Sequence, residues 1–487
     1  MEMPMVKQDV TISIENQSPF HEGCFEGWGT SFCWWANRLG YHEALTAEAA
    51  RLFFDPQEGL GLNIIRYNIG GGDDPTHDHI RRTDSMVPGY AVNPSYEDGV
   101  YHWEYDWTQD ENQRNVLMAV MKDYGKDLIV EAFSNSPPYF MTVSGCSSGA
   151  EDASQNNLRE DAYEAFAKYL ADTAEHFDQE WGVRFQSMTG MNEPETNYWH
   201  AYSEKQEGCH FDGGESQSRM ILALRQALDE KGYSDIQVSA SDETSFDIQV
   251  NTYFQLSDEA KAAVTRIDTH SYYGSNYKAM KKMAVREEKN LWMSETDGGD
   301  VAGEEAGEMG AGLWLAKKII ADMNGLTPSA WILWQVIDSH ICEEGYMGNQ
   351  DSGMVDTDHG YWGLAVADHD AGEIILTMKY YAMGQFTRYI RPGDTIIAGD
   401  ENTLAAYNEA ENRLVIVAVN DKKQQVEACF DVSAFELKDA SVSMIRTSGS
   451  MQDGEKWQET ASEGILDGKL RAVLKENSVT TFVISRQ

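Results

Sequence analysis

Residues 291–297 read LWMSETD, an apolar run that ends in acidic side chains. Short, near-continuous apolar runs of this type are typical of strands that are buried on both faces of a parallel sheet. The chain holds further runs of the same type, and longer segments separate them. Together with 291–297, the expected strands are eight and lie at 25–32, 63–70, 127–134, 185–193, 236–243, 266–273, 291–297 and 330–337.

The segments between these runs have the period of amphipathic helices. In 160–177, Phe166, Tyr169 and Leu170 fall on one face, and similar patterns occupy 218–232 and 311–325. Strands that alternate with helices in this way predict an α/β fold, a (β/α)₈ TIM barrel. A doubly wound sheet is the alternative. It normally has fewer strands and a glycine-rich phosphate fingerprint after its first strand, which is not present here.

The sequence pattern changes after about residue 386, where apolar and polar residues alternate with period two. Such alternation, broken by Asn, Asp and Gly turns, predicts an antiparallel β-sandwich. The stretch VTISIEN at 10–16 alternates in the same way. We therefore expect a barrel over 27–385 and a C-terminal β-sandwich over 386–487, to which residues 1–26 contribute an N-terminal strand.

Composition limits the partners of the chain. Its 487 residues include 38 Lys and Arg against 80 Asp and Glu, a formal charge of −42. Such a surface repels nucleic-acid phosphates and anionic lipid headgroups, so neither nucleic acid nor membrane is an expected partner. Six cysteines are too few for a disulfide scaffold. No signal peptide is visible, which predicts a cytoplasmic protein or a secreted one whose signal peptide is missing from this sequence.

The chemistry is expected at the carboxyl ends of the barrel strands, which form the active-site face of this fold. Glu193 closes the fourth expected strand and Glu295 closes the seventh. These two strands lie across the barrel mouth from each other, so two distant acids can face one another. Two facing carboxyls, one protonated and one ionised, are what the cleavage of a glycosidic bond requires.

Further candidates lie at neighbouring strand ends and in the loops that follow them. Arg66 could hold the charge of Glu295, Tyr272 could donate a hydrogen bond to it, and Asn192 could bind a sugar hydroxyl. Flat aromatic rings can stack on the apolar face of a pyranose. The polar candidates are Arg66, Asn135, Asn192, Asp242, Glu243, His270 and Tyr272, and the aromatic ones are Trp34, Trp35, Tyr139, Tyr198, Trp199 and Trp334.

Several motifs resemble one known family. The NEP at 192–194 and the Glu of the seventh strand are the pattern of clan A glycoside hydrolases. The stretches that resemble glycoside hydrolase family 30 are RYNIGGG (66–72), SNSPPYFM (134–141), THSYY (269–273) and SETDGG (294–299). The resemblance covers nearly the whole chain. It implies that Glu193 is the acid/base, that Glu295 is the nucleophile, and that the anomeric configuration is retained.

Two stretches point to a group within that family. GWGTSFCWWANRLG (27–40) and NEPETNYW (192–199) look most like endo-β-1,6-galactanases, which cut the β-1,6-galactan side chains of arabinogalactan. Other members of the family remain alternatives: β-1,6-glucanases, glucuronoxylanases, glucosylceramidase-like enzymes and exo-acting galactobiohydrolases. The expected partner is an oligo- or polysaccharide, with no cofactor. A carbohydrate-binding barrel without activity would lack one carboxyl, and a metal-dependent hydrolase would lose activity on chelation.

Two polar stretches could suggest a metal, yet we expect none. THDH at 76–79 follows Asp73 and Asp74, but its spacing matches no zinc pattern and no third ligand is evident. DSGMVDTDHG at 351–360 lacks the spacing of a calcium-binding loop. Both are interpreted as polar loops.

Overall fold

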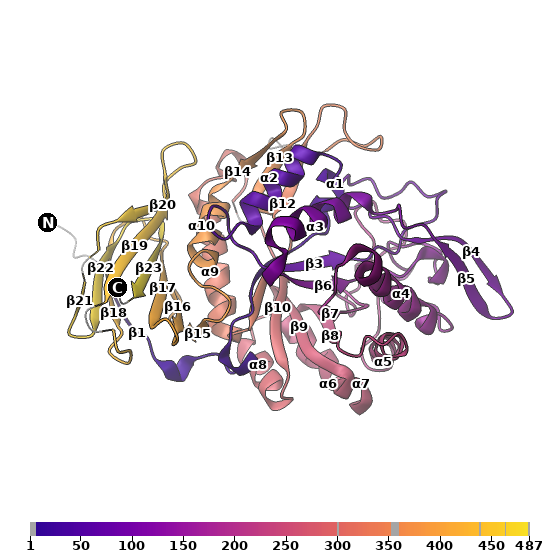
Figure 1. Cartoon of the computed structure of the whole chain (residues 1–487), viewed down its shortest axis with the longest axis horizontal. Coiled ribbons are helices and arrows are strands. Elements are labelled where there is room, and N and C mark those ends of the chain that lie inside the picture. Colours follow the sequence, from indigo (N-terminus) through magenta and orange to yellow (C-terminus); the bar gives the residue numbers. More distant parts are fainter. Residues whose placement is uncertain (1–5, 300, 352–359, 438–439, 463, 486–487) are drawn as a thin grey trace.

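The computed structural model describes residues 6–299, 301–351, 360–437, 440–462 and 464–485. Its centre is a closed barrel of eight parallel strands, so the predicted (β/α)₈ barrel is confirmed (Figure 1). Around the barrel the strands are β2 Gly27–Ser31, β3 Ile64–Asn68, β6 Ile129–Phe133, β7 Ser187–Met188, β8 Gln237–Ser245, β9 Val264–Tyr273, β10 Asn290–Thr296 and β11 Ala330–Leu333.

Helices surround this barrel, as the amphipathic segments predicted. The longest is α4, which buries Phe166, Tyr169 and Leu170 and ends at Gly182 with φ 67°, a left-handed conformation that glycine adopts easily. The helices are α1 Trp35–Leu39, α2 Glu43–Phe54, α3 Glu111–Tyr124, α4 Tyr163–Trp181, α5 Glu215–Glu230, α6 Phe246–Gln255, α7 Asp258–Ala263, α8 Tyr277–Arg286, α9 Met309–Leu326 and α10 Met378–Thr387. Among the described residues, none of the helices has the length and apolarity that a bilayer crossing requires.

The inside of the barrel carries paired charges. Arg66 Nε lies 3.1 Å from Glu131 Oε1, and Arg266 Nε lies 2.6 Å from Asp268 Oδ1. All four side chains are buried. Burial of a charge is costly unless the charge is paired and hydrogen-bonded, so this network fixes the inner faces of β3, β6 and β9 relative to one another.

Two small sheets extend the barrel beyond what the apolar runs predicted. A hairpin of β4 (Ala91–Glu97) and β5 (Val100–Tyr105) lies in the long segment after β3. The last predicted strand, 330–337, ends early at Leu333. The chain then forms a three-stranded sheet of β12 Ile337–Ile341, β13 Ala365–Asp368 and β14 Glu373–Leu376.

The side domain is a β-sandwich, as predicted. Its six-stranded sheet contains β15 Thr395–Ala398, β16 Thr403–Asn408, β17 Arg413–Asn420, β23 Ser478–Ser485, β19 Ser441–Ser448 and β20 Glu455–Thr460. Its four-stranded sheet contains β1 Val6–Thr11, β18 Val426–Asp431, β22 Lys469–Leu474 and β21 Ile465–Leu466. The strand β1 pairs with β18 in parallel, with Val6 opposite Val426. This parallel pair is an exception in a sandwich that is otherwise antiparallel.

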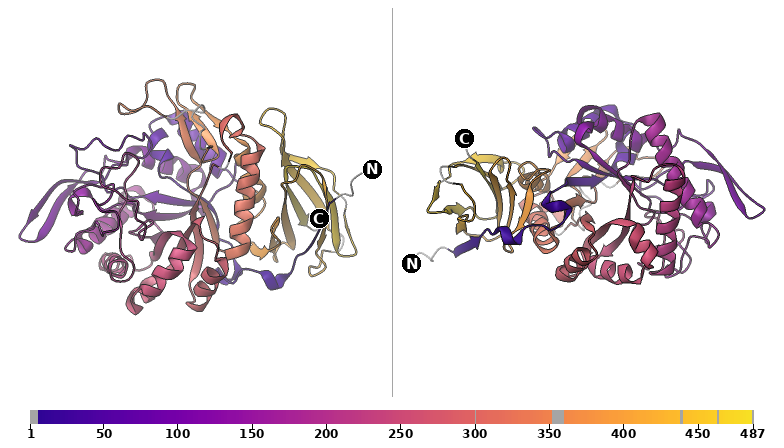
Figure 2. Two further views of the ribbon diagram at one scale, coloured as in Figure 1. Left: turned by 180° about the vertical axis from the view of Figure 1, so that it is seen from behind. Right: turned by 60° about the horizontal axis from the view of Figure 1, so that its bottom comes forward.

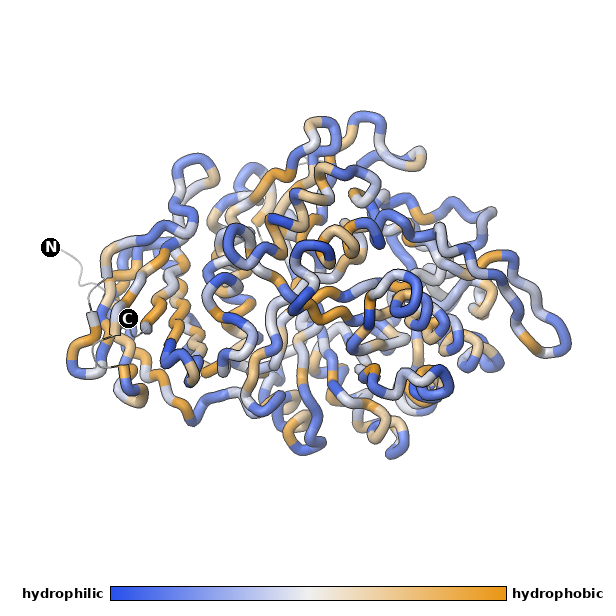
Figure 3. The backbone as a smooth tube through the Cα atoms, viewed as in Figure 1, coloured by the Kyte–Doolittle hydropathy of each residue, from blue (hydrophilic) through white to orange (hydrophobic). Residues whose placement is uncertain are grey.

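The sandwich and the β4–β5 hairpin lie at opposite ends of the molecule, which Figure 2 shows from two further sides. Helices α9 and α10 lie between the barrel and the sandwich (Figure 1). Hydrophobic residues follow the strands of both parts, and hydrophilic residues follow the loops (Figure 3). The second candidate metal stretch, 351–360, falls largely on 352–359, outside the described residues.

Candidate active site

A cavity of about 790 Å³ opens at the carboxyl ends of the barrel strands. Both predicted acids line it, Glu193 after β7 and Glu295 in β10. The other predicted residues in its wall are Trp34, Asn192, Tyr198, Trp199, Tyr272 and Trp334. The structure therefore brings together, on one wall, residues from loops and strands that are more than two hundred positions apart in the chain.

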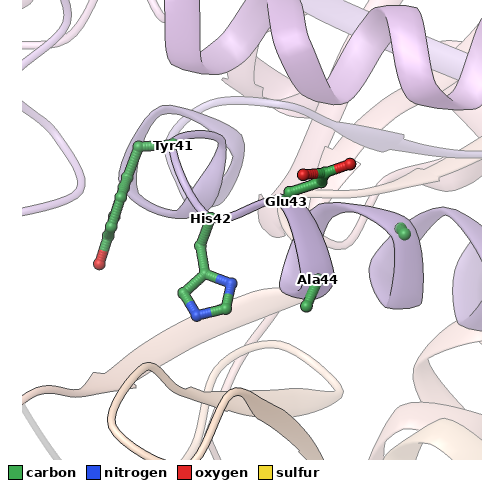
Figure 4. A pocket seen from close by; sticks show the side chains of 5 residues that line it. Tyr41, His42, Glu43 and Ala44 are labelled. Atoms are coloured by element: carbon green, nitrogen blue, oxygen red, sulfur yellow. The ribbon is translucent and has the colours of Figure 1, made fainter.

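A second, shallow pocket of about 590 Å³ lies at the start of α2 (Figure 4). It is lined by Tyr41, His42, Glu43, Ala44 and Ala47. It has a single carboxyl, so it lacks the paired acids that the predicted chemistry requires. The cavity at the strand ends is the better candidate.

Glu193 is held by a tight turn after the short strand β7. Its φ is 48°, and its backbone N–H donates to the carbonyl of Asp242 at 2.8 Å. A left-handed backbone is uncommon for a residue with a Cβ, so neighbouring hydrogen bonds must hold it there. The Glu193 carboxylate accepts a hydrogen bond from the Tyr198 hydroxyl, and His270 Nδ1 lies 3.0 Å from its Oε1.

Glu295 lies near the end of β10, beside a buried cation. Arg66 Nη1 donates to Glu295 Oε2 at 2.8 Å, and the Tyr272 hydroxyl donates to Oε1 at 3.0 Å. Arg66 Nη2 also donates to Asp242 Oδ2 at 2.7 Å. These contacts fix the Glu295 carboxyl and favour its ionised form.

The two acids lie close across the cavity. A carboxylate oxygen of Glu193, a carboxylate oxygen of Glu295 and a ring nitrogen of His270 are all within 4.8 Å of one another. His270 Nδ1 lies 3.6 Å from Glu295 Oε1. Carboxyl groups about 5–5.5 Å apart suit attack of one of them on a sugar, whereas inverting glycosidases separate them by about 6.5–9.5 Å.

Burial and mutual charge shift the titration of this cluster. Burial alone would lower the pKa of His270, but the Glu295 charge and the hydrogen bonds to Asp242 and Glu193 raise it to about 10. His270 is therefore a cation at neutral pH. Burial raises the pKa of Glu295, and the Glu193 charge adds to this effect, while His270 and Arg66 oppose it. Two carboxyls this close favour a state in which one of them carries a proton.

Aromatic rings form the walls beside the acids. Trp34 and Trp334 meet edge to face with centroids 5.0 Å apart, and the Arg82 guanidinium lies 4.7 Å from the Trp34 ring centroid. Tyr272 and Trp362 stack at 5.7 Å. The strand pattern could not predict Arg82 or Trp362, since both lie in loops outside the eight apolar runs.

Seven predicted contact residues do not line the cavity, and the first three are Trp35, Asn135 and Tyr139. Trp35 is fully buried and packs edge-on against Phe32, so the expectation of a sugar contact for Trp35 is wrong. Asn135 is buried beneath the wall, where its amide donates to Cys33 Sγ at 3.5 Å. Tyr139 lies in a short turn after β6, outside the lining residues. For these three residues, a position after a strand end predicted that they lie near the cavity, but it could not predict where their side chains point.

The predicted acids of the fifth strand also differ from expectation. Asp242 points inward, but it lies below the cavity and contacts Arg66. Glu243 points outward and accepts from the Gln217 amide at 2.9 Å. Successive residues of a strand face opposite sides, which is why one carboxyl is inside and the other outside. Burial raises the pKa of Glu243 to about 8. Neither acid lines the cavity.

Arg66 and His270 were expected to touch substrate, and they have a different position. Both are fully buried and absent from the cavity wall. Arg66 holds Glu295, as the sequence suggested, and His270 lies between the two acids. Both are therefore residues that position the carboxyls.

A (β/α)₈ barrel with two facing carboxyls and aromatic walls at its mouth is the arrangement of a glycoside hydrolase. The comparison with family models agrees. The model of O-glycosyl hydrolase family 30 matches residues 9–347, and the chain belongs to this family.

Curated relatives share this framework. The chain is 31% identical to an endo-β-1,6-galactanase of Hypocrea rufa, across 98% of the chain and 95% of the relative. It is 26% identical to an exo-β-1,6-galactobiohydrolase of Bifidobacterium longum subsp. longum, across 82% of the chain but 34% of that longer protein.

Solved structures show the same fold. A conserved exported protein from Bacteroides fragilis has a TM-score of 0.72 at 18% identity, covering 98% of this chain and 100% of that one. The catalytic domain of a family 30 xylanase C from Talaromyces cellulolyticus has a TM-score of 0.71 at 16% identity, with the same coverage.

Proposed function

We propose that this glycoside hydrolase is an endo-β-1,6-galactanase that works by double displacement with retention of configuration. The observation that carries the mechanism is the approach of Glu193 and Glu295 to within 4.8 Å across the cavity. The 31% identity to an endo-β-1,6-galactanase over nearly the full length of both chains supports the substrate. Family 30 membership supports the reaction class.

In the first step, a carboxylate oxygen of Glu295 attacks the anomeric carbon. The bond from that carbon to the leaving oxygen breaks, and the protonated Glu193 gives its proton to this oxygen. The sugar is then an ester on Glu295. In the second step, Glu193 takes a proton from water, the water oxygen attacks the same carbon, and Glu295 leaves as a carboxylate. Two inversions return the starting configuration.

The surroundings of the two acids favour this division of roles. Glu295 is paired with the Arg66 guanidinium at 2.8 Å and with the Tyr272 hydroxyl. The Arg66 charge opposes the rise that burial causes in the pKa of Glu295, and so favours its ionised form. Within the part of the chain that the structure describes, no guanidinium or ammonium group forms an ion pair with Glu193, whose neighbours are the Tyr198 hydroxyl and His270. Once Glu295 becomes an ester, its charge no longer raises the pKa of His270, and the charge balance around Glu193 changes with it.

Substrate recognition has one specific polar anchor. Among the described residues, none provides a hydrogen-bond partner for the buried Oδ1 of Asn192, which lies in the cavity wall beside Glu193. Buried polar atoms are nearly always hydrogen-bonded, so this oxygen suits a sugar hydroxyl. The faces of Trp34, Tyr198, Trp199 and Trp334 supply the apolar surface for the rings.

The second candidate is an exo-acting enzyme on the same linkage, because a relative with 26% identity is named an exo-β-1,6-galactobiohydrolase. Product analysis separates the two. The purified chain is incubated with β-1,6-galactan, β-1,6-glucan, glucuronoxylan and aryl β-glycosides, and early products are followed by chromatography and NMR.

We expect a ladder of galacto-oligosaccharides from β-1,6-galactan, with the β-anomer formed first. Release of a single disaccharide from the start would identify exo action. Turnover of another polymer without any turnover of galactan would overturn the substrate. Initial formation of the α-anomer would overturn the mechanism.

A further inference from the structure

A second group of chemically active side chains lies beside the cavity. Asp73, His77 and His79 come from the loop after β3, and Cys146 comes from the loop after β6. One ligand-type atom from each lies within 4.8 Å of the others. The sequence pattern of 76–79 had no evident third ligand. The fold supplies it from a distant loop, together with Asp73 from just before the motif.

We propose that these four side chains bind one zinc ion. His77 Nδ1 lies 3.2 Å from Asp73 Oδ1, and His79 Nε2 lies 3.3 Å from Asp73 Oδ2. Cys146 Sγ lies 3.4 Å from His79 Nε2. With zinc–nitrogen and zinc–oxygen distances of about 2.0–2.2 Å and a zinc–sulfur distance of about 2.3 Å, neighbouring ligands of a tetrahedral site lie roughly 3.3–3.6 Å apart. The observed distances between the ligand atoms are close to these values.

The donor set selects the metal. A thiolate and two imidazoles suit zinc, whereas calcium and magnesium prefer oxygen ligands alone. Two other groups of this kind occur among the described residues. One is Glu193, His270 and Glu295 of the active site, and the other consists of three barrel carboxyls that face Arg66 and Arg266. Neither contains a cysteine. The loop cluster is thus the one with the donors for a soft divalent ion.

The groups behind these ligands are placed to support them. The backbone N–H of Tyr202 donates to Cys146 Sγ at 3.3 Å, and the Ser148 hydroxyl lies 3.1 Å from the same sulfur. The Ser147 N–H donates to Asp73 Oδ1 at 3.1 Å. Donors to a thiolate and to a ligand carboxylate are typical of metal sites, because they orient the ligands and stabilise the negative charge. Cys146 is fully buried, while Asp73 and the two imidazoles keep some exposure, which leaves a path for the ion.

The position of the site indicates a structural purpose. The loop that carries His77 and His79 continues to Arg82, which lines the cavity. The Tyr202 ring lies 5.2 Å from His77 and 5.3 Å from His79, and Tyr202 precedes Ser203 of the cavity wall. A zinc ion here would link the loops that follow β3 and β6, and its histidine ligands contact Tyr202 in the loop after β7. It would stabilise the rim of the active site without taking part in the reaction.

The test measures binding of the metal itself. The full-length protein is stripped with a chelator, titrated with Zn²⁺ and with Co²⁺, and analysed by mass spectrometry for metal content. Cys146→Ser and His79→Gln remove ligands. Cys209→Ser and His102→Gln are matched controls, because Cys209 is equally buried and His102 lies on the β4–β5 hairpin.

We expect one zinc per chain, and a sulfur-to-cobalt charge-transfer band in the Co²⁺ form that Cys146→Ser abolishes. Zinc at a hundredfold excess over its dissociation constant should raise the melting midpoint by about 3 °C, and this shift should disappear in both ligand variants and persist in both controls. If the wild type takes up no stoichiometric zinc, or if Cys146→Ser binds it equally well, the proposal is wrong.

Discussion

The barrel and the sandwich are both built from buried strands, yet their interiors differ. The sandwich interior is apolar, with Phe430 and Phe482 packed at 5.5 Å. The barrel interior contains Arg66, Glu131 and Arg266, all buried and all paired. An apolar interior needs only volume and shape, whereas a charged one needs every partner in place. The network of charges reaches upward to Glu295, so the barrel interior is continuous with the site. The sandwich interior is not.

Because their interiors differ, the two parts should respond differently to substitution. A change in the charged network should remove activity while the chain stays folded. A change in the sandwich should lower stability while the folded fraction keeps its turnover. Four predictions test this difference.

The largest effect is expected for Glu295→Gln. Without a nucleophile, kcat should fall on the order of 10⁴-fold or more, while substrate binding persists because the shape of the side chain is kept. Steady-state kinetics and calorimetric binding of an oligosaccharide measure the two quantities. The matched control is Glu243→Gln, whose carboxyl faces away from the cavity and is largely neutral at pH 7 because burial raises its pKa to about 8. Near-normal hydrolysis by Glu295→Gln would remove its assignment.

Glu193→Ala should have a smaller effect that depends on the leaving group. Loss of proton donation should slow galactan cleavage by about 10²–10⁴-fold, since a sugar alkoxide leaves poorly. Aryl β-glycosides with acidic phenols need little help and should lose far less in their first step. Rates on both kinds of substrate measure the contrast. Equal losses on both would argue against Glu193 as the acid.

Phe482→Ala tests the sandwich. Removal of this fully buried ring from β23 should lower the free energy of unfolding by about 3–5 kcal/mol. Denaturant unfolding measures this loss, and kcat well below the transition should be unchanged. A fall in kcat under conditions where the variant is fully folded would show that the sandwich shapes the active site. The proposed difference between the two parts would then be wrong.

The smallest effect is a dependence on pH. The folded-state pKa of His270 is raised from 6.5 to about 10, so its charge stabilises the folded barrel fully below pH 6.5. That stabilisation is lost as the pH rises toward 10. Its charged neighbours are Glu193, Glu295 and Asp242. The stability difference between wild type and His270→Gln, measured by denaturant unfolding, should therefore shrink between pH 6.5 and 10. A constant difference would mean that His270 is neutral.

Much of this architecture could be predicted from local pattern. Eight apolar runs were enough to predict the barrel, because each barrel strand buries both of its faces and so has an apolar sequence. The position of Glu193 and Glu295 at two strand ends was enough to place them across one mouth, and the nearby Arg66 and Tyr272 contacts followed from the same geometry.

The features that the sequence pattern did not predict depend on contacts between segments that are distant in the chain. Asp242 and Glu243 face opposite sides of β8, and the apolar run alone did not show which of the two points into the barrel. Trp362 reaches the cavity from a loop beyond the last barrel strand. Cys146 meets His79 only because two loops follow adjacent strands, and nothing in either loop alone reports the other.

The parallel pairing of β1 with β18 has a consequence for biosynthesis. The strand β1 can pair with β18 only after Val426 has been synthesised. At a translation rate of about 5–20 residues per second, β1 therefore spends roughly 20–80 s without its neighbour. The barrel strands emerge in order and can assemble during this interval. Only two β1 residues between 6 and 11 are valine, and Lys7, Gln8 and Asp9 separate them. A polar edge strand of this kind resists pairing with other nascent chains, which suits a segment that is made before the barrel and docks after it.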